Sequence, residues 1–360
     1  MAGSCRIKSA LQNQPSRLKP RLFIHIGTHK TGSTAIQRAL PVGSARLLNE
    51  GLVRLDYHGD ISRQDWTAED EKEATRGLTS QIVISGRPCH YLLTCEGFSG
   101  DPLRGYADAP LIASRLRAVT RDFEVSVIVF LRRQDDFIES IYTQSIHQGG
   151  AQSFQDFQRS LPPGGLDWHR LLETYAAEFG RANLIVRRYH SAFYPEPESL
   201  LVDFCGIVGV NPHILEKEKA AATPNQGYSH EAQEIARQCN AYLSEPERKR
   251  LRTLLQKLSP KPVFQNYSYL DLPSRRAILS GCAETNAAVL RDYLPDSADE
   301  PLFPEPKESP DLSSQDGADP APLTAVLVKM LLEVRESQRG SRLVRLAVKL
   351  DRMLKSLRPK

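Results

Sequence analysis

The sequence predicts an α/β fold in which a central parallel β-sheet lies between two layers of helices. Two observations lead to this prediction. Short apolar runs rich in β-branched residues alternate along the chain with segments of helical periodicity. The strongest run, EVSVIVFL at 124–131, lacks the regular polar alternation of a half-exposed strand. Such a run is typical of a strand that is covered on both faces.

The predicted strands are the runs at 22–26, 90–94, 124–131 and 183–187. Helices are predicted at 33–40, 135–147, 168–178 and 198–208, and residues 229–292 are expected to be mostly helical. The chain of 360 residues is 40% hydrophobic and 25% charged, which is ordinary for a globular protein. A chain of this size can bury a large core without disulfides or a structural metal.

The charge is concentrated near the two ends of the chain. The net charge of +4 includes five Lys and Arg without an acid in residues 1–22, and eight Lys and Arg with one Asp in residues 339–360. Residues 296–322 hold eight acids, one Lys and six prolines. We therefore predict a basic, flexible arm at 1–21, a catalytic domain at 22–295, an acidic Pro-rich linker at 296–322 and a helical tail at 323–360.

The cysteines and the apolar runs indicate the cellular compartment in which the protein is expected. The six cysteines show no CxxC spacing, which argues against a zinc site or a disulfide framework and favours a reducing compartment. No apolar run approaches the roughly 20 residues that span a bilayer. The basic N-terminus also lacks the apolar stretch of a signal peptide. We expect a cytoplasmic protein.

The segment HIGTHKTGST at 25–34 follows the first predicted strand and opens a helix. A loop of this kind presents backbone N–H groups, which suit a phosphate. The spacing Gly27-x4-Gly32 is that of a P-loop, so the predicted fold is P-loop-like, but Ser33 stands where a nucleoside triphosphatase requires Lys. The lysine is instead Lys30, inside the loop.

A second motif follows the 124–131 strand. Arg132 stands at its end, and Ser140 lies eight residues later on the next predicted helix. The two motifs together resemble those of sulfotransferases that use 3′-phosphoadenosine 5′-phosphosulfate (PAPS), and the loop is similar to the Lys-Thr-Gly-Thr/Ser-Thr loop of carbohydrate-type members. The resemblance spans roughly 22–295.

The resemblance implies that PAPS is the co-substrate and identifies the residues that bind it. The loop residues Lys30, Thr31, Gly32, Ser33 and Thr34 would hold the 5′-phosphosulfate. The 3′-phosphate would be held by Arg132 and Ser140, because guanidinium groups suit phosphate dianions. The sequence has Arg133-Gln134 where the family often has Asn/Asp-Pro, which makes Arg133 an alternative partner.

The implied reaction is the transfer of a sulfuryl group from PAPS to a hydroxyl or amine of a carbohydrate or glycolipid, releasing adenosine 3′,5′-bisphosphate. Lys30 would stabilise the charge on the leaving group, and no metal is expected. Glu96 follows the strand at 90–94, at the sheet edge where ligands bind, and is the predicted general base. Alternatively, Glu96 is a solvated loop carboxylate or a salt-bridge partner of Lys30, and His29 is the alternative base.

A polar turn at 224–229 precedes a predicted helix. Asn225 and Ser229 are candidates to close over the cofactor, and Ser229 is equally well explained as an N-cap.

The tail carries an apolar stripe at three- and four-residue spacings between Leu343 and Leu357, with basic residues on its other faces. It predicts that residues 323–357 contact either an anionic membrane surface, which would be the inner membrane surface, or a partner helix.

Two other functions compete with sulfuryl transfer. A P-loop kinase or triphosphatase would need Lys after Gly32 and an acid near position 132 to hold Mg²⁺, whereas the sequence has Ser33 and Arg132. A non-catalytic scaffold of the same fold would not need to retain Lys30. Nucleic acid is not an expected partner, because the body of the chain is nearly neutral and has no basic stripe.

Overall fold

The computed structural model of this chain describes residues 19–57, 59–82, 89–196, 198–214, 227–259, 267–297 and 299–308. The predicted arm lies almost wholly outside these ranges. The predicted tail, most of the linker and Asn225 lie outside them as well. Among the helices of the described ranges, none has the length and apolarity needed to cross a bilayer.

The described residues form two compact units. The first takes its residues from Met1–Arg133, Pro162–Ala222 and Cys282–Pro304. The second takes them from Gln134–Leu161, Thr223–Gly281 and Glu305–Lys360.

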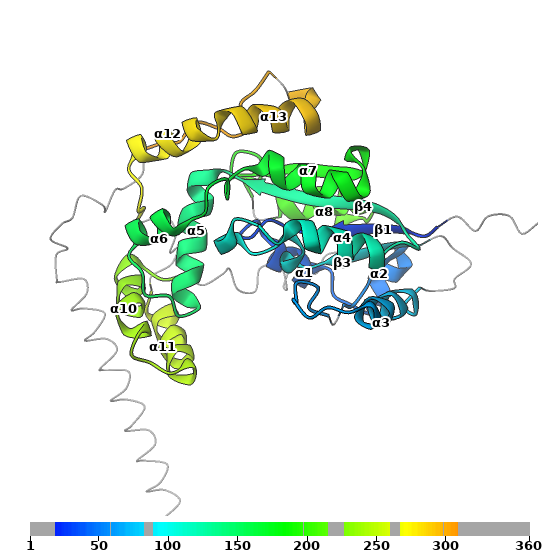
Figure 1. Cartoon of the computed structure of the whole chain (residues 1–360), viewed down its shortest axis with the longest axis horizontal. Helices are drawn as coiled ribbons and strands as arrows, with labels where there is room; N and C mark the ends of the chain where they lie inside the picture. Colours follow the sequence, from blue (N-terminus) through cyan, green and yellow to red (C-terminus); the bar gives the residue numbers. More distant parts are fainter. Residues whose placement is uncertain are drawn as a thin grey trace, which may run out of the picture. The chain divides into compact units, whose positions relative to one another are not determined.

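The first unit is built on a parallel sheet of five strands in the order β2-β3-β1-β4-β5, which confirms the predicted α/β class (Figure 1). The strands are β1 (Arg21–His25), β2 (Leu52–Arg54), β3 (His90–Thr94), β4 (Glu124–Arg132) and β5 (Leu184–Tyr189). Four of them coincide, to within about two residues at each end, with the predicted strands. The short edge strand β2 was not predicted.

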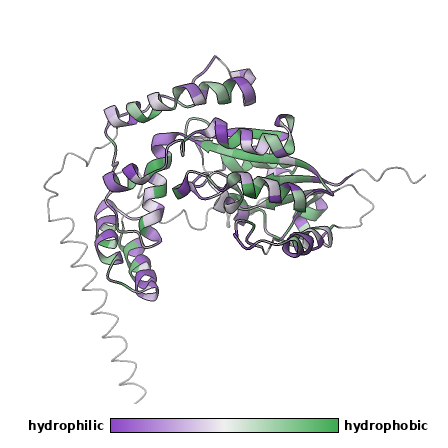
Figure 2. Cartoon of the chain, viewed as in Figure 1, coloured by the Kyte–Doolittle hydropathy of each residue, from purple (hydrophilic) through white to green (hydrophobic). Residues whose placement is uncertain are grey.

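Helices cover both faces of this sheet. The helices of the first unit are α1 (Ser33–Ala39), α2 (Ala45–Asn49), α3 (Ala68–Thr79), α4 (Ala109–Val119), α7 (Trp168–Phe179), α8 (Ser199–Val208) and α13 (Ala283–Tyr293). One core cluster joins residues of α1, α2 and α8 to Phe23 of β1 and to Ile128 and Phe130 of β4. Helices α4 and α7 contact each other, and α7 contacts β4 and β5. The strands are accordingly hydrophobic along their length (Figure 2), as expected of a sheet covered on both faces.

Short 3₁₀ turns complete the first unit. They are η1 (Glu96–Ser99), η2 (Pro102–Arg104), η3 (Arg181–Asn183), η4 (Pro212–Ile214) and η6 (Pro295–Ser297). Of these, η1 follows β3 directly, so Glu96 lies at the carboxyl end of a strand, as the sequence predicts.

The second unit is helical. It contains α5 (Gln134–His147), α6 (Phe154–Ser160), α10 (His230–Asn240), α11 (Glu245–Leu258) and α12 (Leu272–Gly281). The buried Arg275 of α12 joins it to α5, because its guanidinium donates to Asp135 at 2.5 Å and also pairs with Glu139. Asn240 of α10 donates to the carbonyls of Ile146 and Gly150 at 2.8 Å.

Strand β1 lies where the strand order reverses. The chain leaves β1 toward β2 and β3 on one side, whereas β4 and β5 lie on the other. In open α/β sheets, ligands bind at the carboxyl ends of the strands beside this reversal. The fold therefore places the loop after β1 and the end of β4 at the position where a ligand is expected.

Candidate active site

The loop from Gly27 to Gly32 joins β1 to α1 and contains three residues with positive φ. Gly27 has φ +45° and Gly32 has φ +82°, a region that glycine enters without a steric cost. A Cβ atom on Gly32 would lie 2.4 Å from Leu200 Cδ2. Lys30 adopts φ +67°, which is uncommon for a residue with a side chain. Strain of this kind persists only where the surroundings enforce it, and it is concentrated at functional sites.

Three hydrogen bonds enforce the shape of this loop. The buried Thr28 hydroxyl donates to the Phe130 carbonyl of β4 at 2.6 Å, and the Thr31 hydroxyl donates to the Thr28 carbonyl at 2.6 Å. Arg132 Nη1 donates to the Lys30 carbonyl at 2.8 Å. The loop is therefore fixed to β4, and the backbone of Lys30 is held directly by the arginine that the sequence predicts for the cofactor.

His29 lies close enough to Lys30 and to Glu96 for both charges to act on its pKa. Burial lowers the pKa of His29, and the charge of Lys30 lowers it further, whereas nearby carboxylates including Glu96 oppose the shift. His29 is consequently neutral near pH 7. Its Nδ1 atom is buried and has no hydrogen-bond partner among the described residues. These three residues come from the ends of β1 and β3, where the sequence predicts them.

Tyr106 also lies beside this loop, although the sequence did not predict it as a site residue. It is the second non-glycine residue with positive φ in the described part of the chain, at +60°, and only 5% of it is exposed. Its ring lies 6.2 Å from that of His29 and 6.1 Å from that of Trp168, measured between centroids. Burial raises the pKa of Tyr106 well above its usual value. A tyrosine at positive φ beside the loop has no sequence signal, because neither its neighbours nor its spacing mark it.

The remaining predicted loop residues differ in accessibility. Thr34 is exposed, whereas Ser33 is 1% exposed and its hydroxyl has no partner among the described residues. Thr31 is fully buried, and its hydroxyl hydrogen is used within the loop. The Thr31 hydroxyl is therefore committed to the loop, whereas the Thr34 side chain is accessible and the Ser33 hydroxyl is not used by the described residues.

The two arginines that follow β4 have different environments. Arg132 is half-buried, and its guanidinium carbon lies 5.9 Å from the centroid of the Tyr189 ring, the residue paired with it in β5. Arg133 is 6% exposed and donates to the Pro304 carbonyl at 3.1 Å. Arg133 therefore contributes to the packing of the first unit, and Arg132 is the better placed of the two for a ligand.

Two of the other predicted cofactor residues belong to the second unit. Ser140 is half-buried on α5. Ser229 accepts a hydrogen bond from the Ala232 N–H at 3.3 Å and is the N-cap of α10, which confirms the capping interpretation. Asn225 lies outside the described residues.

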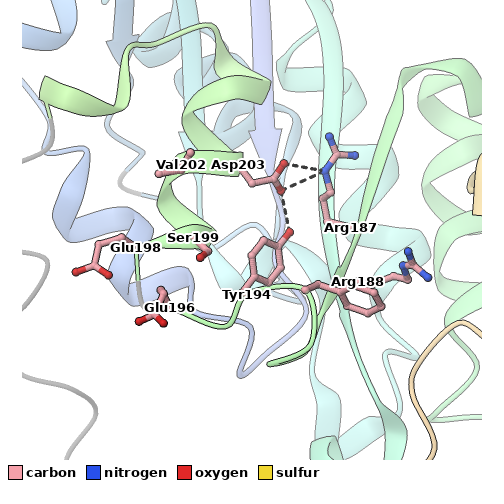
Figure 3. Close-up of a pocket in the computed structure, with 9 residues that line it drawn as sticks. Arg187, Arg188, Tyr194, Glu196, Glu198, Ser199, Val202 and Asp203 are labelled. Carbon is pink, nitrogen blue, oxygen red and sulfur yellow. Dashed lines mark hydrogen bonds and ion pairs between the residues drawn. The ribbon is translucent and has the colours of Figure 1, made fainter.

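A cavity of about 700 Å³ opens between β5 and the start of α8. Its central charges are paired with each other: Arg187 Nε lies 3.2 Å from both oxygens of Asp203, and the Tyr194 hydroxyl donates to the same carboxylate at 2.8 Å (Figure 3). Ser199 lines the cavity, and the next residue, Leu200, contacts Gly32 of the β1 loop.

A charged cluster joins α7 to α13 and has the composition of a metal site. The ligand atoms of His169, Glu173 and Asp292 lie within 4.8 Å of one another. Both carboxylates already have partners: Arg291 pairs with Asp292 at 2.9 Å, and Arg181 pairs with Glu173 at 2.7 Å. These arginines balance the charge of the cluster without an ion.

Comparisons with known proteins give distant similarities. No family model matches the chain. An uncharacterized protein of Archaeoglobus fulgidus is 25% identical over 170 residues, which are 47% of this chain and 45% of that protein. The chain thus spans less than half the length of this relative.

Two solved structures resemble the chain. The sulfotransferase from Alicyclobacillus acidocaldarius is 15% identical with a TM-score of 0.37, and the match covers 64% of this chain and 98% of that one. The sulfotransferase domain from the curacin biosynthetic pathway is 14% identical with a TM-score of 0.32, and the match covers 74% and 98% of the two chains.

Proposed function

We propose that this protein is a PAPS-dependent sulfotransferase that transfers a sulfuryl group to a hydroxyl or amine of a carbohydrate or glycolipid. One observation carries the proposal: the loop after β1 holds Lys30 at positive φ, with Glu96 and His29 close enough to influence each other's charge. The loop has the phosphosulfate-binding spacing, and it lies where the strand order reverses.

In this proposal Lys30 acts on the leaving group. The bond between sulfur and the oxygen that bridges it to phosphorus breaks, and negative charge develops on that oxygen. The ammonium of Lys30 stabilises this charge. Because Arg132 and the Thr28 hydroxyl fix the loop before the substrate arrives, the lysine needs little reorganisation in the transition state.

The new bond forms between sulfur and the acceptor oxygen or nitrogen, whose proton must be removed. Glu96, at the carboxyl end of β3, receives that proton and passes it to solvent. His29 is the alternative base, since the lowered pKa leaves it neutral and able to accept a proton. The products are the sulfated acceptor and adenosine 3′,5′-bisphosphate.

The adenosine end of the donor is assigned to Arg132 of the first unit, and the contribution of Ser140 stays a prediction from the sequence. A kinase or triphosphatase receives no comparable support, because Arg132 occupies the end of β4 where a carboxylate for Mg²⁺ would be required.

The decisive experiment is a transfer assay with sulfur-labelled PAPS against a panel of glycan and glycolipid acceptors. We expect labelled product with the wild-type chain and at least one acceptor class. Lys30→Ala is the negative control. Transfer from ATP rather than PAPS would contradict the proposal.

The base is identified by comparing Glu96→Gln with His29→Gln. We expect Glu96→Gln to bind adenosine 3′,5′-bisphosphate with wild-type affinity and to lose about 10²–10⁴ in turnover. If His29→Gln shows that pattern instead, the base is His29.

For the tail at 323–357 we propose contact with an anionic membrane surface. Co-sedimentation with anionic vesicles should be lost when the chain is truncated at residue 322. Equal sedimentation of both forms would exclude a role for the tail in membrane binding.

A further inference from the structure

Two buried polar atoms beneath the β1 loop lack hydrogen-bond partners. They are Nε2 of His25, the last residue of β1, and Oγ of Ser33, the first residue of α1. Both residues are 1% exposed, and neither atom has a partner among the described residues. Buried polar atoms are paired in the great majority of cases, so two adjacent exceptions require an explanation.

The two atoms face the same point. A Cβ atom built on Gly27 would lie 2.5 Å from Ser33 Oγ and 3.3 Å from His25 Nε2. The space beside Gly27 is therefore bordered by both the imidazole and the hydroxyl. A side chain at position 27 would fill that space.

The imidazole of His25 is locked in orientation. Its ring packs edge-on against Phe204 at 5.2 Å and Phe130 at 5.7 Å, measured between centroids. Its Nδ1 atom lies 2.9 Å from Thr94 Oγ1 at the end of β3. Burial also lowers the pKa of His25 to about 3, so the ring is neutral at physiological pH. One nitrogen thus carries a hydrogen and the other a lone pair, and Thr94 influences which.

We propose that His25 is a positioning residue for the anion-binding loop: its Nε2–H donates to the Ser33 oxygen and so directs the Ser33 hydroxyl hydrogen to the bound phosphosulfate. The inference rests on the function proposed above. In the opposite tautomer, Nε2 would accept the Ser33 hydrogen, and the serine would present lone pairs to an anion. The proposed arrangement has the Thr94 hydroxyl, 2.9 Å from Nδ1, as the donor to that nitrogen, which leaves the hydrogen on Nε2.

When the anion arrives, the Ser33 hydroxyl rotates toward it and its oxygen becomes the acceptor of the imidazole N–H. Catalytic hydrogen bonds commonly tighten in this way only in the complex.

The test is the affinity of the full chain for adenosine 3′,5′-bisphosphate, measured by calorimetry. Two variants separate the roles of the two ring nitrogens. His25→Gln keeps a polar group near the position of Nε2, whereas His25→Asn keeps one near the position of Nδ1. We expect His25→Asn and Ser33→Ala each to weaken binding about 10- to 100-fold, as for one hydrogen bond to a charged group. His25→Gln should remain within about threefold of wild type.

The double variant His25→Asn with Ser33→Ala should bind no more weakly than Ser33→Ala alone, because the imidazole acts only through that hydroxyl. His90→Asn is the matched control. His90 stands at the opposite end of β3, and its Nδ1 is likewise buried without a described partner. Its replacement should leave binding unchanged.

The possible failures are distinguishable. Additive losses in the double variant, or equal losses for His25→Gln and His25→Asn, would overturn the positioning role while leaving the proposed function intact. If wild type does not bind the bisphosphate, the proposed function fails. The nitrogen-15 spectrum of His25 then still decides the tautomer without any ligand. We expect a neutral ring with its hydrogen on Nε2, and mixed tautomers in Thr94→Val. A hydrogen on Nδ1 in the wild-type chain would overturn the inference.

Discussion

Two regions of the first unit bring together polar and charged side chains from distant parts of the chain. They differ in whether these side chains have interaction partners. At the β1 loop, buried atoms of His25, His29 and Ser33 have no partner among the described residues. In the cluster between α7 and α13, His169 lies 2.8 Å from Asp292, and both carboxylates are also paired with arginines. The charged groups of the cluster are thus paired with one another, whereas these three buried atoms at the loop are not paired within the described residues.

This difference distinguishes the proposed binding site from a structural contact. Composition alone points to the cluster, because a histidine and two carboxylates are typical metal ligands. The arginines around it instead suggest that it holds α13 against α7. The loop has no comparable density of charge, but its strained backbone and unpaired buried atoms represent a cost that a bound anion would offset. Four variants test this distinction.

The largest effect is expected from Lys30→Ala. Loss of a preorganised group at the leaving oxygen should reduce transfer by about 10²–10³. The thermal midpoint should change little, because alanine and lysine face the same cost at φ +67°. Lys72→Ala on the exposed face of α3 is the control for loss of a positive charge, and it should retain full activity. Wild-type transfer by Lys30→Ala would remove the loop from the chemistry.

The second-largest effect is expected from His25→Gln, which should change how the stability of the protein depends on pH. The pKa of His25 is lowered from 6.5 to about 3 in the folded state, so the unfolded chain binds a proton that the folded chain does not. The resulting stability is fully present above about pH 6.5 and is lost as pH falls, by about 1.4 kcal/mol per pH unit.

Replacing the histidine removes this proton. The free energy of unfolding of His25→Gln, measured by urea titration between pH 4.5 and 7.5, should therefore fall less steeply with decreasing pH than that of wild type. Equal slopes for wild type and His25→Gln would show that the imidazole is not buried as described.

Much of this arrangement follows from the sequence, and the exceptions have physical causes. The sequence places Lys30 and His29 in the loop after the first strand and Glu96 just past the end of another, and the structure has Glu96 at that end of β3. Strand β2 was not predicted because three residues are too few to show the alternating hydrophobic pattern of a strand. The role of Arg132 in holding the Lys30 carbonyl, and the positive φ of Tyr106, depend on packing between segments about 100 and 75 residues apart. No local pattern encodes such contacts.

The third effect is that of Gly27→Ala. The new methyl group would lie 2.5 Å from Ser33 Oγ, on a backbone with φ +45°. We expect a loss of about 1–3 kcal/mol in the free energy of unfolding and weaker binding of adenosine 3′,5′-bisphosphate. The matched control is Gly77→Ala in α3, where a Cβ would meet nothing within 4 Å. This control should gain about 0.5–1 kcal/mol. If Gly27→Ala behaves like the control, the space beneath the loop is not needed.

The smallest effect is expected from the α7–α13 cluster itself. In Asp292→Asn, the contacts with Arg291 and His169 weaken, and these contacts lower the pKa of Asp292 to about 2. A lowered carboxyl pKa adds stability that is present above about pH 4 and is lost as pH falls toward 2. The variant should therefore have a slightly lower thermal midpoint at pH 7, and the difference from wild type should shrink in acid. Because the charged groups of the cluster are already paired with one another, transfer activity should stay at the wild-type level.

The discriminating measurement is binding of Zn²⁺ by equilibrium dialysis, for which we expect no stoichiometric uptake at this cluster by the wild-type chain. If the wild-type chain binds Zn²⁺ and Asp292→Asn does not, the metal displaces the arginines from the carboxylates, and this region is a second binding site.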